Sequence, residues 1–180
     1  MYLCKVVIKW NKSNEFSLEM DKRKLEIKYT VFKSSEDLSD EDKTLINRAK
    51  KISKLAYSPY SEFGVGSAVL LDNGEIFTAN NQENAAYPQG LCAERIALFY
   101  AMAQYPNQKI KSIAICVNPQ NIDFTSFIFP CGGCRQVMSE YEDRGKEKMR
   151  ILLGNISDEV LLIDGIENLL PFPFSWGNMQ

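Results

Sequence analysis

The sequence predicts an α/β protein, a three-layer α/β/α sandwich built on a five-stranded mixed sheet. Two observations favour this class: runs with helical periodicity alternate with apolar β-type runs, and an Asn-Gly dipeptide at positions 73 and 74 separates two of the β-type runs. The chain has 180 residues, of which 45% are hydrophobic. A chain of this length can bury a core of its own, and it favours a single domain.

The first half of the domain is expected to hold one helix and one hairpin. Ser39 is a suitable N-cap, apolar residues recur at helical spacing after it, and Pro59 stops the helix. Residues 65–71 and 76–79 are β-type runs on either side of the Asn-Gly dipeptide, which is the strongest short signal for a hairpin. We therefore expect an antiparallel pair of strands after the first helix.

The second half is expected to alternate helices and strands. Residues 92–105 are helix formers that are apolar almost all round, so they predict a central, buried helix that Pro106 ends. Pro130 opens a further helix over residues 131–141. The remaining strands are expected at residues 112–117, 149–153 and 160–163.

Residues 1–38 mix charge with short β-like runs and carry no motif, so we interpret them as an extension to a domain at residues 39–180. Met20 is a possible true start, because the coherent pattern needs nothing before it. The sequence shows no secretory leader and no apolar run near the roughly 20 residues that span a membrane. A Cys-x-x-Cys pair among five cysteines suggests a reducing compartment. We therefore expect a cytoplasmic protein with no membrane partner.

The charge and the residue types exclude several classes of function. The formal net charge is -2 and the pI is near 5.3, so the composition does not indicate the positively charged surface that binds nucleic acids. We therefore expect no nucleic-acid polymer as a partner. The chain contains no histidine, which excludes every His-based triad and every zinc site that needs imidazole. Metal chemistry in this chain must therefore use cysteine sulfur.

Three cysteines and one glutamate form the candidate catalytic group. Cys92 stands near the start of one expected helix, and Cys131 and Cys134 stand near the start of another, where the positive helix ends favour thiolates. Three cysteine ligands leave a tetrahedral zinc ion with one open position, which distinguishes a catalytic zinc from a structural one. Glu94, two residues after Cys92, is then placed to move protons beside that position.

Three thiolates carry more negative charge than a Zn²⁺ ion neutralises, so a positively charged group is expected beside them. This surplus charge opposes the lowering of the pKa of a bound water, and Arg95 is the candidate that offsets it by donating to a ligand sulfur. The alternative for Arg95 is a surface arginine. A lone Cys-x-x-Cys could also be a redox pair or half of a closed four-cysteine zinc site. The spare cysteines favour the open site, because Cys116 lies in an apolar run and Cys4 lies in the extension.

Several motifs together resemble the homotetrameric, three-Cys zinc cytidine deaminases, over nearly half of the chain. These motifs are Ala56-Tyr57-Ser58-Pro59-Tyr60-Ser61, Phe63-Gly64-Val65-Gly66, Asn81-Gln82-Glu83-Asn84-Ala85-Ala86-Tyr87, Cys92-Ala93-Glu94-Arg95 and Pro130-Cys131-Gly132-Gly133-Cys134-Arg135-Gln136. The run at residues 169–174 also looks like the ending of this family. Two positions depart from its pattern: Phe129 stands where serine is usual, and Gly133 where alanine is usual.

The resemblance implies the same three-layer fold and an assignment for the metal site. Cys92, Cys131 and Cys134 would hold zinc, and Glu94 would be the proton shuttle that is not a ligand. Gln136 would support the groups around the metal, as Arg95 would.

The resemblance also implies a substrate site. Phe63 would face the pyrimidine ring, while Asn81 and Glu83 would hydrogen-bond the sugar hydroxyls. From the residues alone, Asn81 and Glu83 fit a solvated loop equally well. Phe174 resembles the aromatic residue that a neighbouring subunit inserts over the substrate, and its alternative is a C-terminal core anchor. Tyr87 is a further candidate for substrate binding.

The activity that the resemblance implies is the hydrolytic deamination of cytidine and 2′-deoxycytidine to uridine and 2′-deoxyuridine, with release of ammonia, as a step of pyrimidine salvage. Zinc would be the cofactor, no organic cofactor would be required, and the assembly would be a homotetramer. One alternative is a deaminase of a related aminopyrimidine nucleoside or of a blasticidin-type antibiotic. Another is a zinc-stabilised binding module without turnover.

Overall fold

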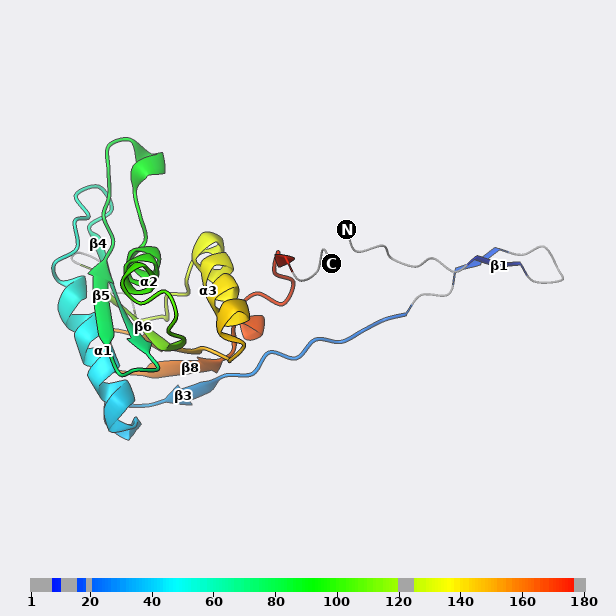
Figure 1. The fold of residues 1–180 in the computed structure, drawn as a ribbon, viewed down its shortest axis with the longest axis horizontal. Helices are drawn as coiled ribbons and strands as arrows, with labels where there is room; N and C mark the ends of the chain where they lie inside the picture. The colour runs from blue at the N-terminus through cyan, green and yellow to red at the C-terminus, as the bar shows by residue number, and fades with distance from the viewer. Residues whose placement is uncertain (1–7, 11–15, 19–20, 120–124, 177–180) are drawn as a thin grey trace.

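The computed structural model describes residues 8–10, 16–18, 21–119 and 125–176, and a mixed six-stranded sheet forms its centre (Figure 1). The strand order is β3-β8-β7-β6-β4-β5, in which β6 and β7 run parallel and the other neighbours antiparallel. The strands are β3 (Thr30–Phe32), β4 (Phe63–Leu71), β5 (Ile76–Asn80), β6 (Ile110–Pro119), β7 (Arg150–Gly154) and β8 (Val160–Asp164).

The predicted fold class is confirmed, with six strands in this sheet instead of five. The five expected strands are present, and the expected hairpin turns at Gly74, whose φ of 88° lies in the region that favours glycine. The sixth strand, β3, comes from the segment that we interpreted as an extension, and it pairs with β8 at the sheet edge. A run of three paired residues is too short for its periodicity to predict that pairing. The boundary before residue 39 stays a prediction.

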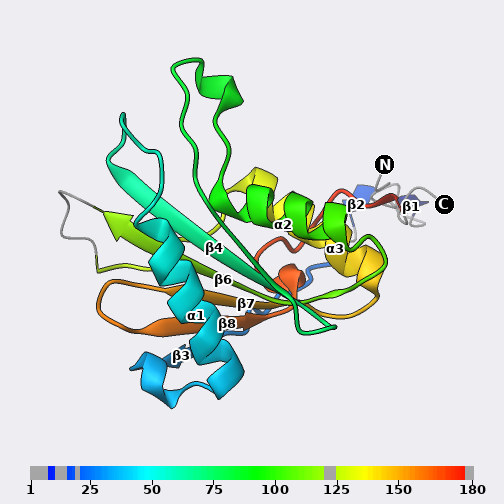
Figure 2. The same ribbon diagram turned by 60° about the vertical axis from the view of Figure 1, so that its left-hand side comes forward.

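Helices cover both faces of the sheet. Helix α1 (Asp40–Ser53) lies on one face, and α2 (Ala93–Gln104) and α3 (Gly132–Gly145) lie on the other (Figures 1 and 2). The expected N-cap of α1 is confirmed, because the Ser39 hydroxyl accepts a hydrogen bond from the backbone amide of Asp42. The short 3-10 turns are η1 (Ser35–Asp37), η2 (Tyr87–Gln89) and η3 (Ile166–Asn168).

Two apolar clusters, one on each face, hold the layers together. Leu45 and Leu152 are buried in the cluster under α1, and Leu98 and Met138 are buried in the cluster under α2 and α3. Helix α1 approaches β4 closely because Gly66 has no side chain: a Cβ atom there would lie 2.2 Å from a backbone oxygen of α1. These contacts hold α1 against one face of the sheet, and α2 and α3, whose first residues carry the site, against the other.

Helix α2 is buried on one side and exposed on the other, so the expectation of a central, buried helix holds for one side only. Ala97 and Leu98 are fully buried, whereas Phe99 is 46% and Tyr100 is 55% exposed. A composition that is apolar all round cannot indicate which side of a helix the rest of the chain leaves open.

The described part of the N-terminal segment contains a small second sheet. Strands β1 (Ile8–Trp10) and β2 (Phe16–Leu18) pair antiparallel in it. None of the helices among the described residues has the length and hydrophobicity of a transmembrane segment.

Candidate active site

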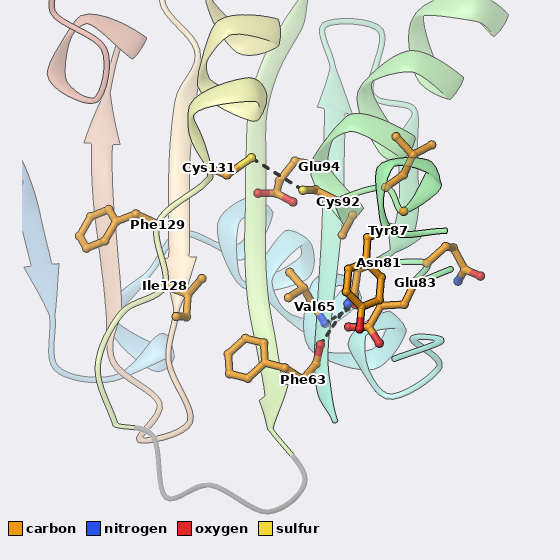
Figure 3. Close-up of a pocket in the computed structure, with 14 residues that line it drawn as sticks. Phe63, Val65, Asn81, Glu83, Tyr87, Cys92, Glu94, Ile128, Phe129 and Cys131 are labelled. Atoms are coloured by element: carbon orange, nitrogen blue, oxygen red, sulfur yellow. Dashed lines mark hydrogen bonds between the residues drawn. The ribbon is translucent and has the colours of Figure 1, made fainter. Parts of the chain in front are cut away.

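The two helices on one face of the sheet begin at cysteines. Cys92 is the N-cap of α2, and Cys131 is the N-cap of α3, in the first turn of which Cys134 lies. Neither N-cap side chain makes a capping hydrogen bond to the backbone of its own helix, and both sulfurs are turned to the space between the helix starts (Figure 3). The positive ends of both helices therefore face the same point, as the sequence predicted.

The three sulfur atoms have the spacing of a zinc site. The Sγ atoms of Cys92 and Cys131 are 3.8 Å apart, those of Cys131 and Cys134 are 3.5 Å apart, and all three lie within 4.8 Å of one another. Three sulfurs bound at about 2.3 Å to a tetrahedral zinc would be about 3.8 Å from each other. The donor set and its geometry thus fit zinc with one position left for another ligand.

Arg95 lies against this sulfur cluster. Its Nη2 donates to Sγ of Cys92 at 3.8 Å, and its Nε is buried with no hydrogen-bond partner in the described part of the chain. Hydrogen bonds from the Cys134 thiol and from Arg95 lower the pKa of Cys92 to about 5, although burial opposes this shift. A lowered pKa favours the thiolate, which is the form that binds metals.

Glu94 lies beside the sulfurs without joining them. Its side chain is buried at 5% exposure, it points toward Cys92 and Cys131, and the three-cysteine group does not include its carboxylate (Figure 3). Burial raises the pKa of Glu94 above its ordinary value. This arrangement suits a group that takes up and releases a proton.

A cavity of about 380 Å³ opens above these residues. Cys92, Glu94 and Cys131 lie at one end of it, and Phe63, Asn81, Glu83 and Tyr87 line it farther out (Figure 3). The structure thus brings two groups of predicted site residues to one cavity. The predicted metal and catalytic residues come from the helix starts, and the predicted substrate-binding residues come from β4 and the segment after β5.

The side chain of Asn81 is engaged with the backbone of β4. Its Oδ1 accepts from the amide of Val65 at 2.7 Å, and its Nδ2 donates to the carbonyl of Phe63 at 3.0 Å. This contact was not expected, because the sequence analysis gave Asn81 either a contact with the substrate or a place in a solvated loop. Because a side-chain amide has two donor hydrogens and two acceptor positions, one of each remains for a ligand.

Glu83 is held by a neighbouring loop. Its Oε2 accepts from the amides of Tyr60 and Ser61, and its Oε1 accepts from the Ser61 hydroxyl. Burial raises the pKa of Glu83, but these hydrogen bonds outweigh it and hold the pKa below its ordinary value. The sequence reasoning assigned no role to Ser61. Its position within one of the quoted motifs was the available signal.

Phe174 and Gln136 contact each other instead of the cavity. The Gln136 Nε2 donates to the Phe174 carbonyl at 2.7 Å, and the Phe174 amide donates to Gln136 Oε1 at 3.2 Å. The Phe174 ring is 70% exposed, so it is no core anchor within its own chain. Gln136 therefore ties the C-terminal segment to α3, and the structure does not bring it to the sulfurs.

The opposite wall of the cavity was not predicted. Ile128 and Phe129 line it, and Phe129, which is 45% exposed, stands across from Asn81 and Tyr87 (Figure 3). Only the departure at position 129 had indicated that this residue was unusual. Tyr87 is 75% exposed and makes an edge contact with Tyr60, with ring centroids 6.0 Å apart.

Comparison with protein families gives an independent result. Residues 39–146 match the family model described as the cytidine and deoxycytidylate deaminase zinc-binding region. A cytidine deaminase of Sporosarcina psychrophila is 35% identical over 131 residues, which cover 73% of this chain and 89% of that protein. A cytidine deaminase of Halalkalibacterium halodurans is 35% identical over 136 residues, which cover 76% of this chain and 96% of that protein.

Solved structures agree. A cytidine deaminase from Burkholderia pseudomallei superimposes with a TM-score of 0.63 at 37% identity, covering 73% of this chain and 98% of that one. A cytidine deaminase from Mycobacterium tuberculosis superimposes with a TM-score of 0.56 at 28% identity, covering 74% and 96% of the two chains.

Proposed function

The chain belongs to the cytidine and deoxycytidylate deaminase zinc-binding family, and on that premise we propose that it deaminates cytidine and 2′-deoxycytidine to uridine and 2′-deoxyuridine. It is a zinc-dependent hydrolase that acts on the C–N bond of a cyclic amidine. The observation that carries the proposal is the buried Glu94 beside three sulfurs at the end of one cavity.

In the proposed reaction, zinc would activate the water and Glu94 would transfer the protons. A zinc ion held by Cys92, Cys131 and Cys134 supplies a Lewis acid that makes water a better nucleophile at neutral pH. Glu94 takes a proton from the attacking water and delivers it to N3 of the pyrimidine. The hydroxide left by that transfer adds at C4. Glu94 then takes the proton of the new C4 hydroxyl and gives it to the amine, the C4–N bond breaks, and ammonia leaves.

The outer part of the cavity binds the nucleoside in this proposal. Phe63 packs against the pyrimidine ring, and Asn81 and Glu83 meet the sugar hydroxyls with the hydrogen-bonding positions that their contacts leave open. Tyr87 borders the sugar end. A 5′-phosphate near the Glu83 carboxylate would suffer like-charge repulsion, so we expect CMP to be a poor substrate.

We also propose that the enzyme is a homotetramer that acts in cytoplasmic pyrimidine salvage. Large apolar side chains are exposed on α2 and on the C-terminal segment, including Phe99, Tyr100, Phe172 and Phe174. Exposed apolar groups of this kind favour burial between subunits. Phe174 would then reach the cavity of a neighbouring subunit, and closed symmetry would make the sites equivalent.

The test measures zinc per chain and the turnover of cytidine and CMP on the same size-fractionated sample. We expect one zinc per chain, uridine formation with release of ammonia in the tetramer fraction, and little turnover of CMP. Phe174→Ala should lose activity. An active monomer would contradict the tetramer. Stoichiometric zinc without turnover of any aminopyrimidine nucleoside would contradict the proposed function.

A further inference from the structure

The loop between α1 and β4 encloses the carboxylate of Glu83. The amides of Tyr60 and Ser61 donate to Oε2 at 2.9 and 3.3 Å, and the Ser61 hydroxyl donates to Oε1 at 2.5 Å. Glu83 lies 22 residues beyond Ser61, so these bonds join two separate loops at the rim of the cavity. Three donors from one short turn make a binding site for a carboxylate.

The turn that carries these three donors has a non-glycine residue in a conformation that favours glycine. Glu62 has a φ of 55°, in the left-handed region that non-glycine residues rarely adopt, and its amide donates to the carbonyl of Ser58 at 3.0 Å. The amides of Tyr60 and Ser61, in the two positions before Glu62, donate to the same carboxylate oxygen. A left-handed conformation of this kind costs about 1 kcal/mol or more and tends to persist at functional sites.

The direction of the Ser61 hydroxyl is fixed from both sides. Its oxygen accepts from the amide of Phe63 at 3.2 Å, which leaves its hydrogen to be donated to Oε1 of Glu83. A carboxylate oxygen accepts about two hydrogen bonds. Oε2 already has two donors, whereas Oε1 has one among the described residues. The remaining acceptor position of Glu83 therefore lies on the oxygen that Ser61 holds.

We infer that Ser61 is a positioning residue, which aims Oε1 of Glu83 at the 2′ or 3′ hydroxyl of the sugar of the bound nucleoside. The inference rests on the proposed function, and it adds the group that sets the specificity for a hydroxylated sugar. Without the Ser61 hydroxyl, the carboxylate is held through Oε2 alone and can turn about that attachment. The sugar contact then weakens, while the chemistry at the pyrimidine ring is untouched.

The experiment compares Ser61→Ala with the parent enzyme on cytidine and on 2′,3′-dideoxycytidine, which lacks the 2′ and 3′ hydroxyls and keeps only the 5′ hydroxyl. We expect the KM for cytidine to rise about tenfold, because a hydrogen bond to a charged group is weakened. We expect kcat to change less than about twofold, as for an interaction made equally in the ground state and the transition state. For the dideoxynucleoside, measured as a substrate or as a competitive inhibitor, the parent and the variant should differ little.

Two further variants separate positioning from a structural effect. Ser61→Thr retains a hydroxyl and should restore the KM for cytidine. If Ser61→Ala does not fold, Ser61→Cys replaces it, since a thiol is a weak donor of similar volume. Ser35→Ala is the matched control, because the Ser35 hydroxyl also donates to a carboxylate, Asp158 Oδ1 at 2.7 Å, away from the cavity. It should leave KM unchanged.

The outcomes are distinct. A parent enzyme that turns over cytidine, with a Ser61→Ala variant that matches it on both nucleosides, overturns this inference and leaves the proposed function standing. An equal rise of KM for both nucleosides also overturns it, because Ser61 would then not act through a sugar contact. A folded, zinc-loaded parent enzyme that turns over no cytidine overturns the proposed function and this inference with it.

Discussion

The inner end and the rim of the cavity each hold one carboxylate, and the pKa values of the two are shifted in opposite directions. Glu94, at the start of α2, is 5% exposed, and burial raises its pKa. Glu83, on a loop at the rim, is also subject to burial, but the bonds from Ser61 and the amide of Tyr60 lower its pKa overall. The same residue type therefore meets two opposed environments within one cavity.

The difference shows that the surroundings of each glutamate, and not the residue type, decide which role its carboxylate suits. A carboxyl group that holds its proton more readily suits proton transfer, as we propose for Glu94. A carboxylate that stays ionised suits the acceptance of hydrogen bonds from a hydroxyl, as we propose for Glu83. The inner end should therefore control the rate of the chemical step, and the rim should control affinity.

The largest expected effect comes from removing a sulfur at the inner end. Cys131→Ser should abolish zinc binding and turnover together, because the remaining sulfurs of Cys92 and Cys134 cannot complete the donor set. Zinc per chain, measured by elemental analysis beside the rate with cytidine, checks this. Cys116→Ala is the control, since Cys116 is buried in β6 outside the cluster and should not change zinc content. Full zinc content in Cys131→Ser would show that the assigned donor set is wrong.

The next effect compares the two carboxylates directly. Glu94→Gln should retain zinc and lower kcat by about 10²- to 10⁴-fold, because the amide cannot transfer the proton. Glu83→Gln should act mainly on KM, because an amide is a weaker acceptor for a hydroxyl than a carboxylate. Zinc content and steady-state kinetics of both variants check the division. Loss of zinc from Glu94→Gln would make Glu94 a ligand and contradict its assigned role.

The sequence could predict the inner end of the cavity because its residue types are distinctive and part of its spacing is local. Local spacing places Glu94 beside Cys92 and Cys131 beside Cys134, whereas the two pairs, 39 residues apart, were joined only by the shared need of a zinc ion for cysteine ligands. The alternation of helices and strands likewise predicted the layers and five strands of the sheet. These features depend on neighbours in the chain, and the periodicity of the chain reports them directly.

The rim could not be predicted in the same way, because its contacts join distant segments. The hydroxyl of Ser61 meets Glu83 across 22 residues, and the amide of Asn81 bonds to the backbone of β4. Strand β3 pairs with β8 across most of the chain. No local pattern encodes these pairings, so the partners of the rim residues emerge only from the folded structure.

A smaller effect concerns the charge balance at the inner end. Arg95→Gln should weaken zinc retention or slow turnover by roughly 10- to 100-fold, because Arg95 donates to the Cys92 sulfur and offsets the charge of the thiolates. Competition with a chelator, together with kcat, measures both outcomes. Arg48→Gln is the control, because Arg48 is exposed on α1. Equal zinc retention and equal rates for the two variants would remove Arg95 from the site.

The smallest effect tests whether a hydrogen-bonded carboxylate away from the cavity matters for stability alone. Asp158 accepts from Lys50 and from the hydroxyls of Ser34 and Ser35, and these contacts hold its pKa well below the ordinary value. Because the group is partly exposed, Asp158→Asn should cost about 0.5–1 kcal/mol and lower Tm by about 1–4 °C, with kcat and KM unchanged.

The pH dependence of this loss has a definite sign. A lowered pKa in the folded state means that the stability from Asp158 is fully present above the unfolded pKa of about 3.9 and is lost as pH falls toward the folded value. The difference in Tm between the parent and Asp158→Asn should therefore be largest near neutral pH and shrink in acid below about pH 4. Asp37→Asn, an exposed neighbour in η1, is the control. A difference in Tm that is the same at neutral and acid pH would show that Asp158 stabilises the fold by something other than its charge.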